Sequence, residues 1–276
     1  MTSGFSRRCI SAVVLGASTL AVALTGCVGT GGHAAAPARQ QQNLPLPTMS
    51  QVPGQLAPER IVIIGDSLST GYGTAPEEAW PRLLEQDLRS QRQRHPVEVI
   101  NAAQDGAGYI AVGDDGGAFG SQINATIDAS TDIVVFFGSD NDAGQDPGEL
   151  KSAITDALQA SNKLAPHATR IMIGPLTAFD SVQSDIKMIR DQERVAAHEA
   201  GIDFVDPVAE RWIPHPDSPL LGPDNEHPSS QGQEFLEQKI KGLVTTLKGR
   251  TTPSLPKSQP TSSHPVSPVA EATKRS

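Results

Sequence analysis

Residues 61–73 read IVIIGDSLSTGYG, and the point where the apolar run gives way to small polar residues decides the fold. Four β-branched apolar residues lead into Gly65, Asp66 and Ser67, which indicates a buried strand that ends in a loop. A serine that follows a strand and opens a helix is exposed, and the N–H groups of the helix end favour developing negative charge. Ser67 is therefore either a nucleophile or the N-cap of a helix in a binding loop. The G-x-S-x-G elbow is excluded because its second glycine is missing.

Further apolar runs follow the first at intervals that leave room for helices. The five runs are residues 60–65, 97–103, 132–138, 169–176 and 202–207. Helices are expected over residues 76–91, 146–164, 181–201 and 229–247. Alternating strands and helices predict a five-stranded parallel sheet with right-handed crossovers, in a three-layer α/β/α sandwich. Such sheets bind ligands at the carboxyl ends of their strands, so the functional residues are expected in the loops there.

Three later loops at this edge carry candidate partners for the serine. The loop NAAQDGAGY holds Gly106 and Gly108, and glycine offers an unobstructed N–H group that suits an oxyanion hole. The loop GSDNDAG holds Asn141, whose side-chain amide can donate to an oxyanion. The loop GPDNEHPSSQG holds Asp224 and His227, three residues apart, just before the last expected helix. A histidine beside a carboxylate can accept a serine proton while the carboxylate fixes its tautomer.

Each of these loops also has an ordinary structural interpretation. Clusters of Asn, Asp and Gly are typical of turns, and GSDNDAG could be a calcium loop, although the spacing of an EF-hand is absent. His227 could be a solvated surface residue. His215 with Asp217 forms a competing pair, but no helix follows it and no matching block lies elsewhere. Trp80 and Trp212 are interpreted as packing residues rather than as platforms for sugars.

The first 27 residues have the features of an export signal. A pair of arginines precedes an uncharged apolar stretch over residues 9–24. This stretch is short for a membrane-spanning helix, which needs about 20 apolar residues. The sequence LTGC, which ends at Cys27, resembles the lipobox of bacterial lipoproteins, in which the cysteine is acylated and becomes the new N-terminus. An ordinary signal peptide cut near Ala36 is the alternative, and SRRCI leaves Sec and twin-arginine export open.

Composition divides the remainder into a linker, one folded domain and a tail. The expected segments are a signal peptide over 1–27, a disordered linker over 28–58, the domain over 59–248 and a disordered tail over 249–276. Cys9 and Cys27 are the only cysteines, so the mature domain can form no disulfide. The chain has 22 basic and 31 acidic residues, and removal of residues 1–26 leaves 20 against 31, a net charge of −11. This acidic balance argues against a nucleic-acid partner.

In their order along the chain, the four polar motifs resemble the blocks of the GDSL, or SGNH, hydrolase family. GDSLSTGYG is similar to the first block, NAAQDG to the glycine block, GSDND to the asparagine block and DNEHP to the last. The resemblance covers residues 65–228 and implies the flavodoxin-like fold of that family. It assigns the nucleophile to Ser67 and the other triad positions to Asp224 and His227. It assigns the oxyanion hole to Ser67, Gly106 and Asn141.

The resemblance implies serine-dependent hydrolysis of carboxylic esters without a metal or an organic cofactor. An exported protein, held at the outer face of the membrane through Cys27 or secreted, is expected to act on acyl esters of envelope glycans or lipids. Transfer of the acyl group to a sugar hydroxyl would use the same residues and stays open. A catalytically idle lipoprotein that binds glycans is the alternative outside the enzymes. The glycine block departs from the family pattern, so Gly108 stays an alternative to Gly106 as N–H donor.

Overall fold

The computed structural model describes residues 57–91 and 96–251, and these residues contain one parallel sheet. Its strands are β1 (Glu59–Ile64), β2 (Val97–Asn101), β3 (Thr131–Phe137), β4 (Thr169–Ile173) and β5 (Asp203–Val205). The strands lie in the order β2-β1-β3-β4-β5, so β1 and β3 occupy the centre of the sheet. The five-stranded parallel α/β/α sandwich predicted from the alternation of apolar runs is confirmed.

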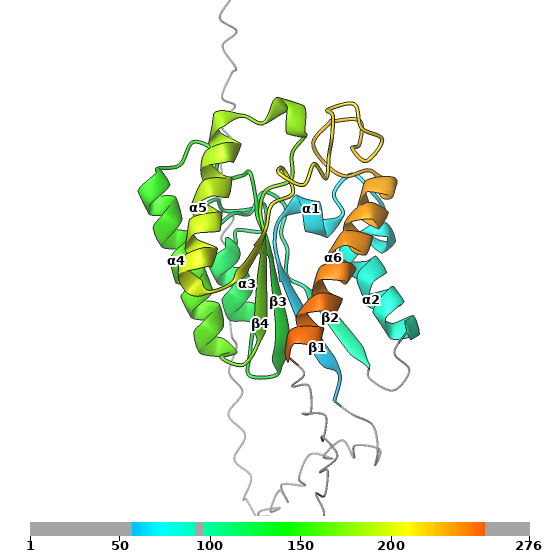
Figure 1. Ribbon diagram of the computed structural model, residues 1–276, viewed down its shortest axis with the longest axis vertical. Coiled ribbons are helices and arrows are strands. Elements are labelled where there is room, and N and C mark those ends of the chain that lie inside the picture. Colours follow the sequence, from blue (N-terminus) through cyan, green and yellow to red (C-terminus); the bar gives the residue numbers. More distant parts are fainter. Residues whose placement is uncertain (1–56, 92–95, 252–276) are drawn as a thin grey trace, which may run out of the picture. The chain divides into compact units, whose positions relative to one another are not determined.

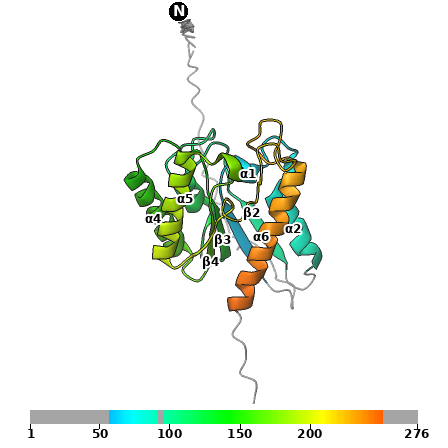
Figure 2. The same ribbon diagram turned by 45° about the horizontal axis from the view of Figure 1, so that its top comes forward.

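Helices cover both faces of the sheet (Figure 1). They are α1 (Ser67–Thr70), α2 (Trp80–Gln91), α3 (Phe119–Thr126), α4 (Pro147–Leu164), α5 (Ser184–Ala200) and α6 (Ser230–Thr251), with 3₁₀ turns η1 (Pro76–Glu78) and η2 (Phe179–Ser181). Helices α2 and α6 lie on one face, and α3, α4 and α5 lie on the other, as a second view also shows (Figure 2). This arrangement produces two separate apolar cores, one on each side of the sheet.

The four apolar residues that end β1 divide their side chains between these two cores. Ile61 and Ile63 pack with α2 and α6, whereas Val62 and Ile64 pack with α3, α4 and α5. Successive strand residues point to opposite faces, and both faces are covered, so all four side chains are fully buried. The continuous apolar run in the sequence follows from this position at the centre of the sheet.

Most helix boundaries follow the signals in the sequence. The side chain of Asp146 caps α4 by accepting hydrogen bonds from the N–H groups of Gly148 and Glu149. Gly201 ends α5 in the left-handed conformation, with φ of 68°. Helix α6 continues to Thr251, beyond the expected end of the domain at residue 248. No proline lies between the start of this helix and Pro253, so the sequence contains no helix-breaking residue at position 248.

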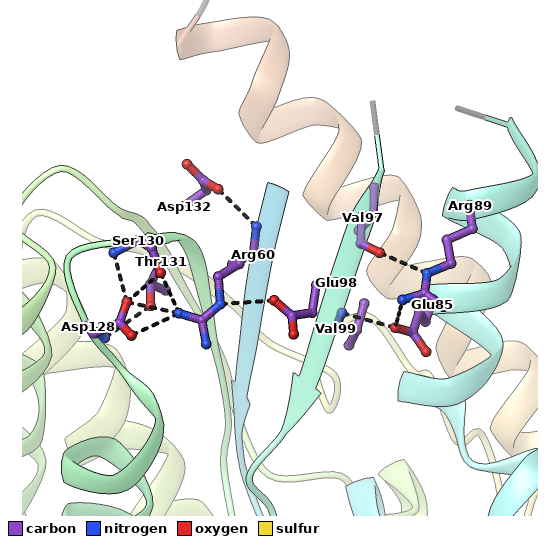
Figure 3. Close-up of polar contacts among 10 residues, drawn as sticks. All are labelled: Arg60, Glu85, Arg89, Val97, Glu98, Val99, Asp128, Ser130, Thr131 and Asp132. Carbon is purple, nitrogen blue, oxygen red and sulfur yellow. Dashed lines mark hydrogen bonds and ion pairs between the residues drawn. The ribbon is translucent and has the colours of Figure 1, made fainter. Parts of the chain in front are cut away.

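Arg60 joins three elements at the amino-terminal edge of the sheet (Figure 3). Its Nε lies 3.1 Å from Oε2 of Glu98 on β2, and its Nη1 lies 2.9 Å from Oδ1 of Asp128, in the turn before β3. Its backbone N–H donates to Oδ2 of Asp132 at 2.9 Å. Hydrogen bonds from Ser130 and then from Arg60 lower the pKa of Asp128 to about 2. The start of β1 is thereby tied to both neighbouring strands, at the edge opposite the loops that follow their carboxyl ends.

Several predictions concern residues 1–56 and 252–276 and lie outside the described part of the chain. They are the export signal, the lipobox at Cys27, nearly all of the linker and all but the first residues of the tail. Across residues 57–91 and 96–251, no helix combines the length and the apolar character needed to span a membrane.

Candidate active site

The end of β1 is held in place by a buried glutamine of α3. The backbone N–H of Gly65 donates to Oε1 of Gln122 at 3.0 Å, and Nε2 of Gln122 donates to the carbonyl oxygen of Gly65 at 2.9 Å. A Cβ atom at position 65 would lie 2.9 Å from Oγ of Ser69, so a side chain there would displace this hydroxyl. The two hydrogen bonds to Gln122 therefore hold the backbone just before Ser67 in place.

Asp66, not Ser67, is the N-cap of α1. Oδ1 of Asp66 accepts a hydrogen bond from the N–H of Leu68 at 3.0 Å, which leaves the hydroxyl of Ser67 available for other contacts. The alternative that Ser67 caps this helix is wrong. The sequence predicts that the N-terminus of this helix favours negative charge. Because α1 has only four residues, this effect comes from individual backbone N–H groups at its start. The N–H of Ser67 is one of these, and it has no hydrogen-bond partner within the described residues.

Ser67, His227 and Asp224 form a continuous chain of hydrogen bonds. Oγ of Ser67 lies 2.9 Å from Nε2 of His227, and Nδ1 of His227 lies 2.8 Å from Oδ2 of Asp224. With Nδ1 donating to the carboxylate, Nε2 of the neutral imidazole carries the lone pair that can accept the serine proton. The structure thus brings together three residues that the sequence separates by up to 160 positions.

The loop of residues 224–227 turns back on itself so that both side chains face Ser67. Oδ1 of Asp224 accepts from the backbone N–H groups of Glu226 and His227, at 3.0 Å each, and Asn225 adopts a positive φ of 58°. Although partial burial raises the pKa of Asp224, the hydrogen bonds from the His227 ring and from these N–H groups hold it below the ordinary value. Asp224 is therefore ionised at neutral pH and keeps the imidazole in one tautomer.

The loop after β2 holds Gly106 and Gly108, the two glycines that the sequence offers as N–H donors. Gly106 has a φ of 73°, and its N–H makes no hydrogen bond to any described residue. The N–H of Gly108, by contrast, donates to the carbonyl oxygen of Ala111 at 2.9 Å. Of the two glycines that the sequence left open as donors, Gly106 is the one with an available hydrogen.

Asn141 lies in the same region, but its amide already faces protein oxygens. Its Nδ2 lies 3.1 Å from Oδ2 of Asp66, 3.0 Å from the carbonyl oxygen of Ala107 and 2.8 Å from Oγ of Ser139. An amide nitrogen carries only two hydrogens for these three acceptors. Asn141 therefore ties the loops after β1, β2 and β3 together, and it would have to exchange one of these contacts to serve an oxyanion.

Asp142 is a buried residue that sequence reasoning missed. Its Oδ2 accepts from the N–H of Tyr109 at 2.7 Å, and its Oδ1 accepts from the N–H groups of Ile110 and Ala111 at 3.0 and 2.8 Å. A Cβ atom at Gly108 would lie 2.6 Å from Oδ2 of Asp142, so only glycine fits there. The sequence signal was present, because Asp142 follows Asn141 directly, but a polar residue in such a cluster is expected to form a turn.

Three further carboxyl or aromatic groups surround the site. Burial raises the pKa of Asp66 to about 7, against the opposing effect of hydrogen bonds from Leu68 and Ser139. Burial likewise raises the pKa of Glu193 on α5 well above its ordinary value, beneath the backbone of Gly138. The ring of Tyr72 packs against the imidazole of His227, with the ring centroids 4.5 Å apart.

The competing His/Asp pair does not form. Nδ1 of His215 lies 2.7 Å from Oδ2 of Asp180, at the exposed turn η2, rather than near Asp217. No nucleophilic side chain bonds to this histidine within the described residues. No group of three or more His, Cys, Asp or Glu side chains in the described chain is placed to hold a metal ion.

Comparisons with known proteins agree with this geometry. A family model described as the GDSL-like Lipase/Acylhydrolase family matches residues 63–235, which include all five positions of the motifs. The chain is 34% identical over 191 residues to the GDSL lipase Rv0518 of Mycobacterium tuberculosis (strain ATCC 25618 / H37Rv), covering 67% of this chain and 81% of the relative.

Solved structures show the same fold at lower identity. TesA matches with a TM-score of 0.54 and 16% identity, covering 68% of this chain and 99% of TesA. The psychrotrophic esterase EstA from Pseudoalteromonas sp., in a structure inhibited by monoethylphosphonate, matches with a TM-score of 0.53 and 19% identity. That match covers 69% of this chain and 99% of EstA. At these identities the likeness concerns the fold alone.

Replacement of Asp66 by asparagine should flatten the dependence of stability on pH. A carboxyl whose pKa is raised from 3.8 to about 7 on folding binds its proton more tightly in the folded state. Its contribution to stability is therefore complete below about pH 4 and is lost as the pH rises to about 7. We expect the fall in Tm between pH 4.5 and pH 7.5 to be several degrees smaller in Asp66→Asn than in the wild type, measured by calorimetry.

The substitution also removes the carboxylate oxygen that accepts a hydrogen bond from Asn141, which destabilises the variant at both pH values. The change in Tm between the two pH values therefore does not include this contribution. Replacement of the exposed Asp156 of α4 by asparagine is the control and should leave the wild-type pH dependence unchanged. Parallel Tm curves for Asp66→Asn and the wild type would contradict the assignment of a raised pKa to Asp66.

Proposed function

The chain belongs to the GDSL-like lipase/acylhydrolase family of hydrolases, and from this premise we propose that it is a serine esterase with Ser67 as nucleophile. The observation that carries the proposal is the chain of hydrogen bonds from Ser67 through His227 to Asp224, at 2.9 and 2.8 Å. These distances lie within the range in which a base can take a proton from a nucleophile.

In the proposed reaction, Oγ of Ser67 attacks the carbonyl carbon of an ester while its proton passes to Nε2 of His227. Asp224 accepts the hydrogen bond from Nδ1 and stabilises the imidazolium that forms. Collapse of the tetrahedral intermediate breaks the bond to the alcohol, which leaves with the proton from His227. Water then attacks the acyl-enzyme, with His227 again as base, and releases the carboxylic acid and free Ser67.

The oxyanion of the intermediate is proposed to bind the N–H groups of Ser67 and Gly106, with Asn141 as third donor. The two backbone groups support this role because neither has a partner in the described residues. Asn141 would turn one amide hydrogen from Ser139 or Ala107 towards the oxyanion. Loss of one such donor typically lowers kcat by about 10²- to 10³-fold.

The proposed substrates are acyl esters of glycans or lipids of the cell envelope, and the proposed location is the outer face of the membrane. These proposals rest on the apolar signal-like segment and on the lipobox-like LTGC ending at Cys27. The acidic balance of the chain is compatible with a neutral ester substrate and argues against a nucleic-acid partner.

Replacement of Ser67 by alanine should abolish ester hydrolysis, with a loss of kcat of at least about 10⁴-fold for p-nitrophenyl acetate. The fold should persist, because Asp66 rather than Ser67 caps α1. Labelling by a fluorophosphonate probe should mark Ser67 in the wild type and disappear in the variant. Undiminished turnover by Ser67→Ala would contradict the proposed mechanism.

Product analysis of the ester reaction and labelling by the fluorophosphonate probe together separate hydrolysis from the alternative functions. An acyltransferase would form an acylated sugar when a sugar acceptor is added, and a glycan-binding protein without catalysis would not react with the probe.

Replacement of Asp142 by asparagine should lower kcat by about 10-fold while leaving the secondary structure intact, a smaller loss than the roughly 10²- to 10³-fold typical of removing a direct oxyanion donor. The variant keeps the volume of the side chain but presents an N–H₂ group to the N–H of Tyr109, which disturbs the loop that holds Gly106. The matched control is Asp146→Asn, on the same loop, because asparagine also caps a helix. Wild-type kcat in Asp142→Asn would show that this contact does not position the oxyanion donors.

Replacement of Cys27 by serine should move the protein from the membrane fraction to the soluble fraction of the producing bacterium. The lipobox cysteine is the proposed site of acylation, and serine does not supply its thiol. Mass spectrometry of the wild type should show an acylated N-terminal cysteine. A wild type without this modification, or a Cys27→Ser variant that stays with the membrane, would contradict the proposed anchor.

A further inference from the structure

Tyr72 is the exposed aromatic residue of the site, and the proposed mechanism does not use it. Its side chain is 51% exposed, whereas Trp80 and Trp212 are 0% and 2% exposed. The expectation that both tryptophans pack in the core is therefore confirmed, and neither can offer a ring face to a ligand. Tyr72 packs against His227 with the ring planes inclined at 42° and the centroids 4.5 Å apart, while the rest of its ring faces solvent.

The backbone holds Tyr72 in a fixed relation to the nucleophile. Its N–H donates to the carbonyl oxygen of Ser67 at 3.3 Å. It lies between Gly71 and Gly73, both in the left-handed region with φ of 85° and 80°. A Cβ atom at Gly71 would also lie 2.7 Å from Cβ of Ala79, so this turn requires glycine and cannot easily rearrange. The ring is thus carried by a turn with a defined backbone conformation and a hydrogen bond to Ser67.

The position of the ring beside His227 indicates which half of the ester it meets. In the proposed reaction, His227 passes its proton to the oxygen of the leaving alcohol, which must come within about 2.6–3.2 Å of Nε2. A group bonded to that oxygen lies next to the imidazole and therefore next to the ring of Tyr72. The acyl half, in contrast, is attached to the carbonyl carbon that Ser67 attacks and that the oxyanion donors hold.

From this juxtaposition we propose that Tyr72 forms the subsite for the alcohol portion of the ester, and that this subsite fits an alcohol with a ring, such as an acylated sugar. The inference rests on the proposed function. A tyrosine ring offers a flat apolar face with a polar edge, which suits a ring that has both apolar and hydroxyl-bearing surfaces. A small alcohol such as methanol is too short to cover that face.

The experiment compares two series of esters with the full chain. One series keeps the acetyl group and varies the alcohol: methyl acetate, phenyl acetate and a glucose monoacetate. The other keeps phenol and varies the acyl group from acetyl to octanoyl. The variants are Tyr72→Ala, Tyr72→Phe, which keeps the ring, and Val195→Ala, which removes an exposed apolar side chain from α5, outside the site.

In Tyr72→Ala, we expect kcat/KM for phenyl acetate and glucose monoacetate to fall about 3- to 10-fold further than for methyl acetate, the range expected for loss of one aromatic contact. The relative preference among acyl groups should stay that of the wild type. Tyr72→Phe should retain the wild-type ranking of alcohols, and Val195→Ala should match the wild type throughout. A purely structural role for Tyr72 would not produce this dependence on the alcohol.

Two results would overturn the inference while leaving the proposed function intact. An equal loss for all three acetates in Tyr72→Ala would mean that the ring acts only through His227 or through the fold. A change in acyl preference with no change among alcohols would place the ring in the acyl subsite. If the wild type hydrolyses no ester and its Ser67 is not labelled by fluorophosphonate, the proposed function fails and the inference fails with it.

Discussion

The central position of β1 is the constraint on which the site depends. Pairing with β2 on one side and β3 on the other places the ends of three strands at one edge of the sheet. The loops that carry Ser67, Gly106 and Asn141 begin at those three ends. Apolar burial on both faces holds β1 at the centre of the sheet, because its four apolar side chains fill both cores. The positions of the polar residues therefore follow from the packing of apolar ones.

Polar contacts then convert this proximity into defined geometry. Gln122 holds the end of β1, Asp142 holds the loop after β2, and Asn141 connects both of these to the loop after β3. These groups are buried or partly buried, where a hydrogen bond is stronger and an unsatisfied group is more costly than in water. A buried carboxyl such as Asp66 is consequently tolerated because its oxygens have partners, although burial raises its pKa. Within the described part of the chain, the N–H groups of Ser67 and Gly106 remain donors without acceptors.

Much of the fold could be predicted because local signals and tertiary structure agree. The apolar runs became strands within a few residues of their expected bounds, and Asp146 and Gly201 mark helix ends as their side chains or conformations suggest. Helix α3 was missed because Phe119 and Ile123 are its only large apolar residues, too few to show a period. Gln122 could not be identified without that helix. The partner of His215 was also missed, because Asp180 comes from a turn 35 residues earlier.

By itself, the sequence determined the class of fold, the order of the motifs and the residue types available for chemistry. These properties depend on periodicity and spacing along the chain, which a linear sequence carries in full. Three features could be seen only after folding: Asp66 rather than Ser67 caps α1, Gly106 rather than Gly108 has an N–H without a partner among the described residues, and Tyr72 lies on His227. The first two outcomes involve residues two or three positions apart, but several donors and acceptors compete there, and the folded backbone selects among them. The third joins two loops that lie far apart in the sequence, and three-dimensional packing sets that contact.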